Sequence, residues 1–109
     1  MGQAKRLISE AITFANNRVQ FDQTISQMPS IQNLIADSYS EMLAAEALTL
    51  NAAEKFDSGV IPETEISSAK YFSSEMVSKV ADRSLQIMGG AGYMEDNAIT
   101  RLYRDTRLF

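Results

Sequence analysis

The most unusual feature of the chain is a concentration of glycine near its end, in the stretch QIMGGAGYMEDNAITRLYRDTRLF from Gln86 to Phe109. Three of the five glycines lie there, at Gly89, Gly90 and Gly92. One glycine is enough to end a helix. The others leave backbone amides and carbonyls uncovered, so a nucleotide or phosphate could approach them closely beside the next helix. The alternative is that the glycines only end a helix.

The segment RVQF, residues 18–21, carries a second group of candidate binding residues. The guanidinium of Arg18 has the fork shape that suits a pyrophosphate. The amide of Gln20 can form hydrogen bonds, and the ring of Phe21 offers a face on which a purine could stack. The alternative is a solvated arginine and a core phenylalanine at the end of a helix.

The third candidate is the segment RLYRDTR, residues 101–107. Arg101, Arg104 and Asp105 are spaced i, i+3 and i+4, so they share one side of a helix. They could form an ion pair within that helix, which contributes only about 0.3–0.5 kcal/mol at a surface. They could also bridge to a neighbouring helix or subunit. Both interpretations are structural rather than catalytic.

Other kinds of site are not expected. The chain has no cysteine and no histidine, which removes disulfides, thiolate metal ligands and the commonest general base. Its acids fall mainly on polar faces, so we predict no metal site. Glu95 and Asp96 are adjacent and favour capping of the next helix over acid–base work. Ser73 and Ser74 have no base near them in the sequence, so no nucleophilic residue is predicted.

Length and composition indicate one small domain, residues 1–109, with a single core. Hydrophobic residues make up 45% of the chain, which is typical of a globular protein. The net charge of −4 and the absence of a basic tract argue against a nucleic-acid partner. No apolar run approaches the ~20 residues of a membrane span. No signal peptide is recognisable, so we expect a cytoplasmic protein, or one of the mitochondrial matrix if eukaryotic.

Hydrophobic periodicity predicts that helices carry these segments. Pro29 and Pro62 suit helix starts, and Gly59 suits a helix end. A short fourth helix is expected over residues 97–106, with Asp96 or Asn97 as its N-cap. Residues 22–27 are interpreted as a loop, and no strand is expected. The expected buried stripes are Ala4, Leu7, Ile8, Ala11, Ile12, Ala15 and Val19; then Ile31, Leu34, Ile35, Met42, Ala45, Thr49, Ala52 and Phe56; then Ile66, Ala69, Ser73, Met76, Val77, Val80, Ala81, Ile87 and Met88.

These elements predict an all-α fold, an antiparallel up-down bundle of three long helices and one short helix. Such an arrangement does not close a four-helix bundle completely. Some apolar surface should remain uncovered, which favours self-association or docking onto another domain.

Taken together, the three segments resemble the C-terminal helical domain of the acyl-CoA dehydrogenases, over essentially the whole chain. Arg18 and Phe21 match the family's Arg-x-x-Phe. Gln86, Gly89, Gly90, Gly92 and Tyr93 match its Gln-x-x-Gly-Gly-x-Gly-Tyr/Phe, and Arg104, Asp105, Arg107 and Leu108 match its Arg-Asp-x-Arg/Lys-Ile/Leu. The order and spacing of all three motifs agree.

The resemblance implies an FAD-dependent oxidoreductase that introduces a double bond into acyl-CoA thioesters. It implies that Gln86, Gly89 and Gly90 lie against the ADP half of a flavin held mainly by a partner subunit. It also implies that Arg18 lies near the pyrophosphate, with Gln20 and Phe21 near the phosphate and adenine. A homo-oligomer, a dimer or a tetramer, follows from the same resemblance.

The chain departs from the family pattern in three places. Asp22 stands where a glycine is frequent, and an acid beside a pyrophosphate weakens binding. Pro29 stands where many members have glutamine. The family's catalytic glutamate would come four residues after Phe109, so we expect a truncated domain with no catalytic residue, inactive alone. The alternatives are a non-catalytic oligomerisation module derived from the family and an unrelated bundle with chance motif matches.

Overall fold

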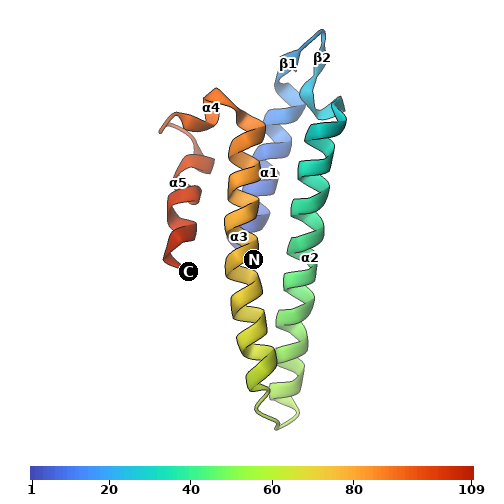
Figure 1. Cartoon of the computed structure of the whole chain (residues 1–109), viewed down its shortest axis with the longest axis vertical. Coiled ribbons are helices and arrows are strands. Elements are labelled where there is room, and N and C mark those ends of the chain that lie inside the picture. Colours follow the sequence, from blue (N-terminus) through green and yellow to red (C-terminus); the bar gives the residue numbers. More distant parts are fainter.

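Three amphipathic segments form the long helices of the structure and run alternately up and down one axis (Figure 1). A computed structural model describes all 109 residues. The helices are α1 (Gly2–Asn17), α2 (Pro29–Asp57) and α3 (Glu63–Met88), followed by a single turn, α4 (Gly90–Tyr93), and the short α5 (Ala98–Asp105). A 3-10 turn, η2 (Thr106–Leu108), ends the chain. The predicted all-α up-down bundle is confirmed, and α4 is an addition to it.

The helix ends follow from the residues at them. Pro29 opens α2, where a missing backbone N–H costs nothing. Gly59, with φ +89°, follows the end of α2, and Gly89, with φ +57°, ends α3. Both angles lie in the left-handed region that glycine adopts most readily. Asn97 is the N-cap of α5, because its side chain accepts a hydrogen bond from the Thr100 amide.

The expectation of a plain loop over residues 22–27 was wrong. The strands β1 (Val19–Gln20) and β2 (Gln23–Thr24) form an antiparallel hairpin, which continues into a 3-10 turn, η1 (Ile25–Gln27). Phe21 and Asp22 connect the strands, both with positive φ. A two-residue turn with two positive φ angles has the twist that joins paired strands. Strands of two residues are too short to show an alternating pattern, so the sequence carried no signal for them.

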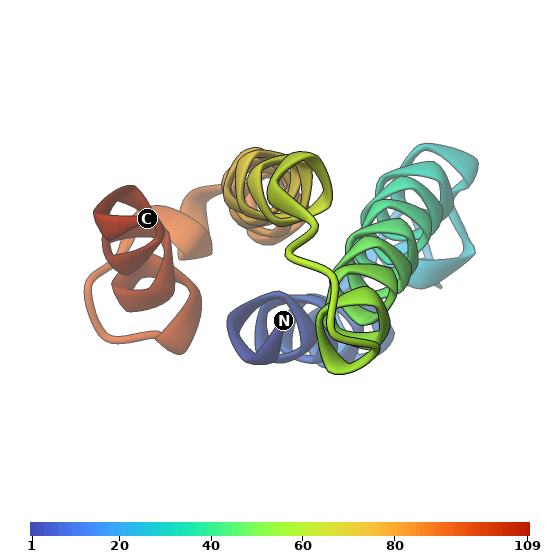
Figure 2. The ribbon, with the colours of Figure 1, turned by 90° about the horizontal axis from the view of Figure 1, so that it is seen from below.

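The core lies where α1 and α3 face each other, with α2 and α5 on opposite flanks (Figure 2). Leu7 of α1, Val80 of α3 and Ile99 of α5 are almost completely buried there. Alanines supply much of the rest, and their small side chains let the helices approach closely. The buried hydrophobic cluster consists of Ala4, Leu7, Ile8, Ala11, Ala15, Ile25, Met42, Ala45, Met76, Val77, Val80, Ala81, Ile87 and Ile99.

The three long helices differ in length, and the core stops where α1 does. α1 has 16 residues, about 24 Å, whereas α2 has 29, about 43 Å. Near the α2–α3 connection two helices therefore pack without a third (Figure 1). We call this part, residues 50–66, the open end; the large apolar side chains exposed there are Leu50, Phe56, Val60, Ile61 and Ile66.

Several residues that the periodicity predicts to be buried are exposed in the chain: Ile12, Val19, Thr49, Phe56 and Ile66. The last three lie at or beside the open end, where no third helix covers them. Val19 lies in the hairpin, outside helix α1.

None of the helices is both long and apolar enough to cross a bilayer.

A two-pronged ion pair joins α2 to α3 at the middle of the bundle. The Arg83 guanidinium donates to both carboxylate oxygens of Glu41, at 2.8 and 3.0 Å. Both side chains are partly buried, 19% and 30% exposed. The hydrogen bonds from Arg83 hold the pKa of Glu41 below its ordinary value, and they outweigh the opposing effect of burial. Glu41 therefore stabilises the fold when it is ionised.

Replacing this carboxylate, Glu41→Gln, should lower the free energy of unfolding by about 1 kcal/mol near neutral pH. Because the folded-state pKa is lowered, the contribution is fully present above the ordinary value of 4.5 and is lost as the pH falls through the folded value. The deficit of the variant should therefore be smaller at a pH well below 4.5 than at neutral pH. Urea unfolding at both pH values measures it, with Glu95→Gln, at an exposed ion pair, as the control. An equal deficit at both pH values would contradict this account.

Candidate functional site

The three clustered glycines have three different relations to the fold. We call Gly89–Gly92 the glycine turn. Gly89 ends α3 with φ +57° and ψ −136°, a conformation that residues with a Cβ rarely adopt. Its amide donates to the carbonyls of Leu85 and Gln86, both at 3.1 Å. The backbone angle alone therefore explains Gly89, as expected for a glycine that ends a helix.

Gly92 is required by packing. It is buried, and a Cβ there would lie 2.9 Å from the Leu85 carbonyl oxygen and 3.1 Å from Cβ of Met88. Both atoms belong to α3, so the absence of a side chain lets the turn fold back onto the end of that helix. From the sequence alone, this role could not be separated from ligand contact.

Gly90 is explained by neither reason. Its φ is not positive, and a Cβ there would meet nothing within 4 Å. It is exposed, as is the neighbouring Tyr93, whose side chain is 86% exposed. The fold of the chain therefore does not account for a glycine here, and its bare backbone faces open space. Gln86, one turn earlier on α3, is also exposed.

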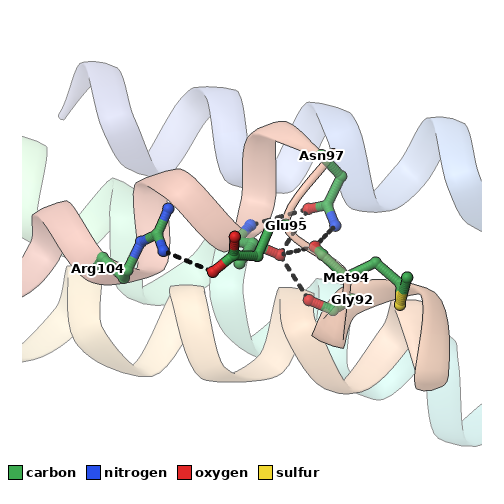
Figure 3. A network of polar contacts seen from close by, with 6 residues as sticks. Gly92, Met94, Glu95, Asn97 and Arg104 are labelled. Carbon is green, nitrogen blue, oxygen red and sulfur yellow. Dashed lines mark hydrogen bonds and ion pairs between the residues drawn. The ribbon is translucent and has the colours of Figure 1, made fainter.

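The turn is tied to α5 by a network of polar contacts (Figure 3). The Thr100 hydroxyl lies 2.6 Å from the Gly92 carbonyl oxygen. The side-chain nitrogen of Asn97 donates to the carbonyl oxygens of Ala91 and Met94, at 3.1 and 2.6 Å. Sequence reasoning identified Asn97 as a possible cap but missed Thr100, because its partner lies eight residues earlier. Glu95 and Asp96, which were expected to cap the next helix, do not cap α5.

The segment at residues 18–21 forms one side of the hairpin and its turn. Arg18 and Gln20 are exposed, and the ring of Phe21 is 87% exposed. The alternative of a core phenylalanine was therefore wrong, whereas Arg18 is solvated. Phe21 has φ +53°, a rare conformation for a bulky residue, and Asp22 has φ +61°, which aspartate tolerates better. Such strain is most frequent at functional sites.

The hairpin and the glycine turn lie at the same end of the bundle (Figure 1). α1 and α3 run in the same direction, so the hairpin that follows α1 and the turn that follows α3 emerge together. This arrangement brings the six candidate residues to one end of the molecule, in two groups: Arg18, Gln20 and Phe21 on the hairpin, and Gln86, Gly89 and Gly90 at the turn.

The C-terminal segment has a different ion pair from the predicted one. Arg104 contacts Glu95, at 3.3 Å, and not Asp105. The pair links α5 to the segment before it and is well exposed, so it contributes little to stability. No group of three or more acidic side chains is close enough together to hold a metal ion.

A cleft of about 310 Å³ lies away from both candidate groups, between the start of α1, the first half of α3 and Phe109. Lys70 lines it, donates to the Phe109 carbonyl at 3.3 Å and lies 5.8 Å from the centre of that ring. The Ser73 hydroxyl beside it is buried with no hydrogen-bond partner. None of the six candidate residues lines this cleft.

Known proteins match the chain over its whole length. It matches the family description "Acyl-CoA dehydrogenase, C-terminal domain" over residues 1–109. The 3-(aryl)acrylate reductase of Clostridium sporogenes (strain ATCC 15579) is 40% identical over 108 residues, which are 99% of this chain and 29% of that protein.

Two solved structures illustrate the similarity of the fold. Butyryl-CoA dehydrogenase from Megasphaera elsdenii superposes with a TM-score of 0.94 at 30% identity, covering 98% of this chain and 28% of that one. The FAD complex of PigA superposes with a TM-score of 0.90 at 25% identity, covering 94% of this chain and 27% of that one. The chain thus spans less than a third of these proteins. From the family match over all 109 residues and the shared helical fold, the chain belongs to the acyl-CoA dehydrogenase family and corresponds to its C-terminal domain.

Proposed function

We propose that this chain is the part of an FAD-dependent acyl-CoA dehydrogenase-type oxidoreductase that contacts the adenine side of the cofactor and forms the oligomer interface. The cofactor-binding residues are Arg18, Gln20 and Phe21 on the hairpin and Gln86, Gly89 and Gly90 at the glycine turn. The flavin ring and the acyl-CoA substrate belong to the whole enzyme. The observation that carries the proposal is Gly90, an exposed glycine that the fold itself does not require.

The chemistry of the two groups fits the ADP half of FAD. Without a Cβ at Gly90, a phosphate or ribose can come within hydrogen-bonding distance of the backbone. The Arg18 guanidinium can donate two parallel hydrogen bonds to a pyrophosphate. An exposed Phe21 ring can stack on adenine, which repays the cost of a bulky residue at positive φ. Asp22 opposes this assignment through its charge, although its backbone angle suits the turn.

In this proposal the residues of the chain bind and orient; none of them moves a proton. When bound, the flavin supplies hydride acceptance or donation, the chemistry for which such enzymes use it. The glycine turn and the hairpin fix the adenine end of an elongated cofactor. Holding that end restricts the motion of the ring at the other end, which helps to keep it aligned with the substrate.

The surface of α2 supports the oligomer part of the proposal. An apolar stripe runs along its outer side, formed by Ala36, Tyr39, Leu43, Ala47 and Leu50, all of them exposed. Their spacing of three and four residues places them on one face, opposite the buried one. We call this set the α2 outer stripe. It continues into the open end, so a second copy that packs along it would also cover the apolar side chains left without a third helix.

The second candidate is an oligomerisation module without a cofactor. The acid at Asp22 and the extent of the α2 outer stripe favour it. The two candidates agree on self-association and differ on nucleotide binding, so a nucleotide titration separates them.

Titration of the chain with ADP and with FAD should shift the backbone NMR signals of Arg18, Phe21 and Gly90. Gly90→Ala should weaken the affinity about tenfold, equivalent to ~1.4 kcal/mol, because its methyl group occupies the approach of the ligand. Stability should stay within about 0.5 kcal/mol of wild type, since the methyl group meets no protein atom. Gly2→Ala, which also has open space but lies on α1, is the matched control. No shift at millimolar ligand would favour the oligomerisation module.

Leu43→Glu should convert the self-associated chain to a monomer without unfolding it, because Leu43 is exposed and a charge there prevents apolar packing along the α2 outer stripe. Ala44→Glu adds the same charge at an exposed position of the same helix, outside the stripe, and should leave association intact. Sedimentation equilibrium and circular dichroism measure the two effects. A monomeric wild-type chain at ~100 µM, a concentration at which a micromolar dimer is mostly associated, would contradict this part of the proposal.

A further inference from the structure

Two side chains at the start of α5 contact the backbone of the glycine turn and of Met94, which follows it. They are Asn97, the N-cap of the helix, and Thr100, three residues later. Figure 3 shows Asn97 beside the backbone of Gly92 and Met94, whose carbonyl oxygens take part in the network of polar contacts. We call the two side chains the Asn97–Thr100 clamp. The Asn97 side chain also caps α5, whereas the Thr100 hydroxyl is not needed for that cap, so the two roles can be tested separately.

Asn97 serves both the helix and the turn. Its side-chain oxygen accepts from the Thr100 amide at 2.8 Å, the ordinary work of an N-cap. Its side-chain nitrogen donates to the Met94 oxygen at 2.6 Å and the Ala91 oxygen at 3.1 Å. The first contact would be enough to start α5. The other two are made to the carbonyl oxygen of Ala91, which also accepts from the Met94 backbone amide at 3.3 Å, and to that of Met94, just after the turn.

The Thr100 hydroxyl serves the turn. It lies 2.6 Å from the Gly92 oxygen and 2.8 Å from the Met94 oxygen, and it can donate its one proton to either. It is also 3.1 Å from the Asn97 side-chain oxygen. Gly92 is buried, so without the Thr100 hydroxyl its carbonyl oxygen would lose a hydrogen-bond partner where little water can replace it. The Thr100 amide, by contrast, is bonded to Asn97 whatever the side chain at position 100.

The other side of the turn is fixed by α3. Gly92 packs where even one added carbon atom would lie 2.9 Å from the Leu85 oxygen. The turn is thus held at Gly92 between α3 and the clamp, while Gly90, two residues earlier, remains open on its outer side.

We propose that Thr100 and Asn97 are positioning residues for the cofactor: they hold the glycine turn in the shape that presents the Gly90 backbone to the ADP half of FAD. This inference rests on the proposed function and adds to it two residues that do not contact the ligand themselves. A backbone surface binds tightly only if it is already in its bound shape, because ordering it on binding reduces the affinity. The clamp supplies that order before the ligand arrives.

The test uses Thr100→Val, which keeps the shape, the branched Cβ and the backbone amide, and therefore the N-cap, but removes the hydroxyl. Thr100→Ser, which keeps the hydroxyl, is the rescue variant. Two properties are measured on the full chain: hydrogen exchange of the Gly90–Gly92 amides, and the affinity for ADP followed by NMR. Thr49→Val is the matched control, since its hydroxyl bonds the Ala45 carbonyl on α2, far along the chain from the turn.

Thr100→Val should raise exchange in the turn and weaken ADP binding about fivefold to tenfold, the effect of one hydrogen bond of ordinary net strength. Exchange in the middle of α2 and α3 should not change. Thr100→Ser should stay within about twofold of wild type in both properties, and so should Thr49→Val.

The outcomes separate the two proposals. If the wild-type chain binds no ADP, the proposed function is wrong and the cofactor role of the clamp falls with it. If the wild type binds and Thr100→Val binds equally tightly, the inference alone is wrong and the clamp only starts α5. Unchanged exchange in the turn of Thr100→Val would also overturn the inference, since the turn would then keep its shape without the hydroxyl.

Discussion

Burial of one face of α1 is the constraint on which the rest of the structure depends. α1 contacts α2, α3 and α5, and its inner face is made of Leu7 and of alanines at positions 4, 11 and 15. Full burial of a leucine side chain is worth about 1.5–3 kcal/mol, and the alanines let three helices approach the same face. The direction of α1 then decides that the hairpin after it and the turn after α3 come to one end.

The same helix sets the limit of the core. α1 is only 16 residues long, so beyond its start the other two long helices continue as a pair. Two helices cannot enclose apolar side chains on all sides, and Leu50, Phe56 and Ile66 are accordingly exposed. The single chain is therefore well packed at the end that carries the candidate site and unfinished at the other. In our proposal a second copy completes the unfinished part, so that association and cofactor binding belong to the same assembly.

The glycine turn shows how neighbouring residues of one type can have separate causes. Gly89 is required by its backbone angle and Gly92 by the closeness of α3, whereas neither reason applies to Gly90. A motif that appears uniform in the sequence thus contains two glycines that the fold requires and one that it does not. The hairpin adds an independent sign of function in the strained, exposed Phe21. Both features cost stability or leave surface uncovered, and both lie at the same end of the bundle.

The sequence by itself determined the helices α1, α2, α3 and α5 and their order, because apolar periodicity, prolines and glycines act within a few residues of each other. The order and spacing of three motifs indicated the family. The sequence left the N-cap of α5 open between Asp96 and Asn97, and the structure shows that it is Asn97. It could not show that Phe21 is exposed, since that depends on a hairpin whose strands have two residues each. The sequence pattern indicated that α1 is shorter than α2, but only the packed structure showed that no third helix covers Thr49 and Ile66. The roles of Gly92 and Thr100 were decided by the tertiary structure alone, because each depends on a backbone oxygen that only the folded turn brings within reach.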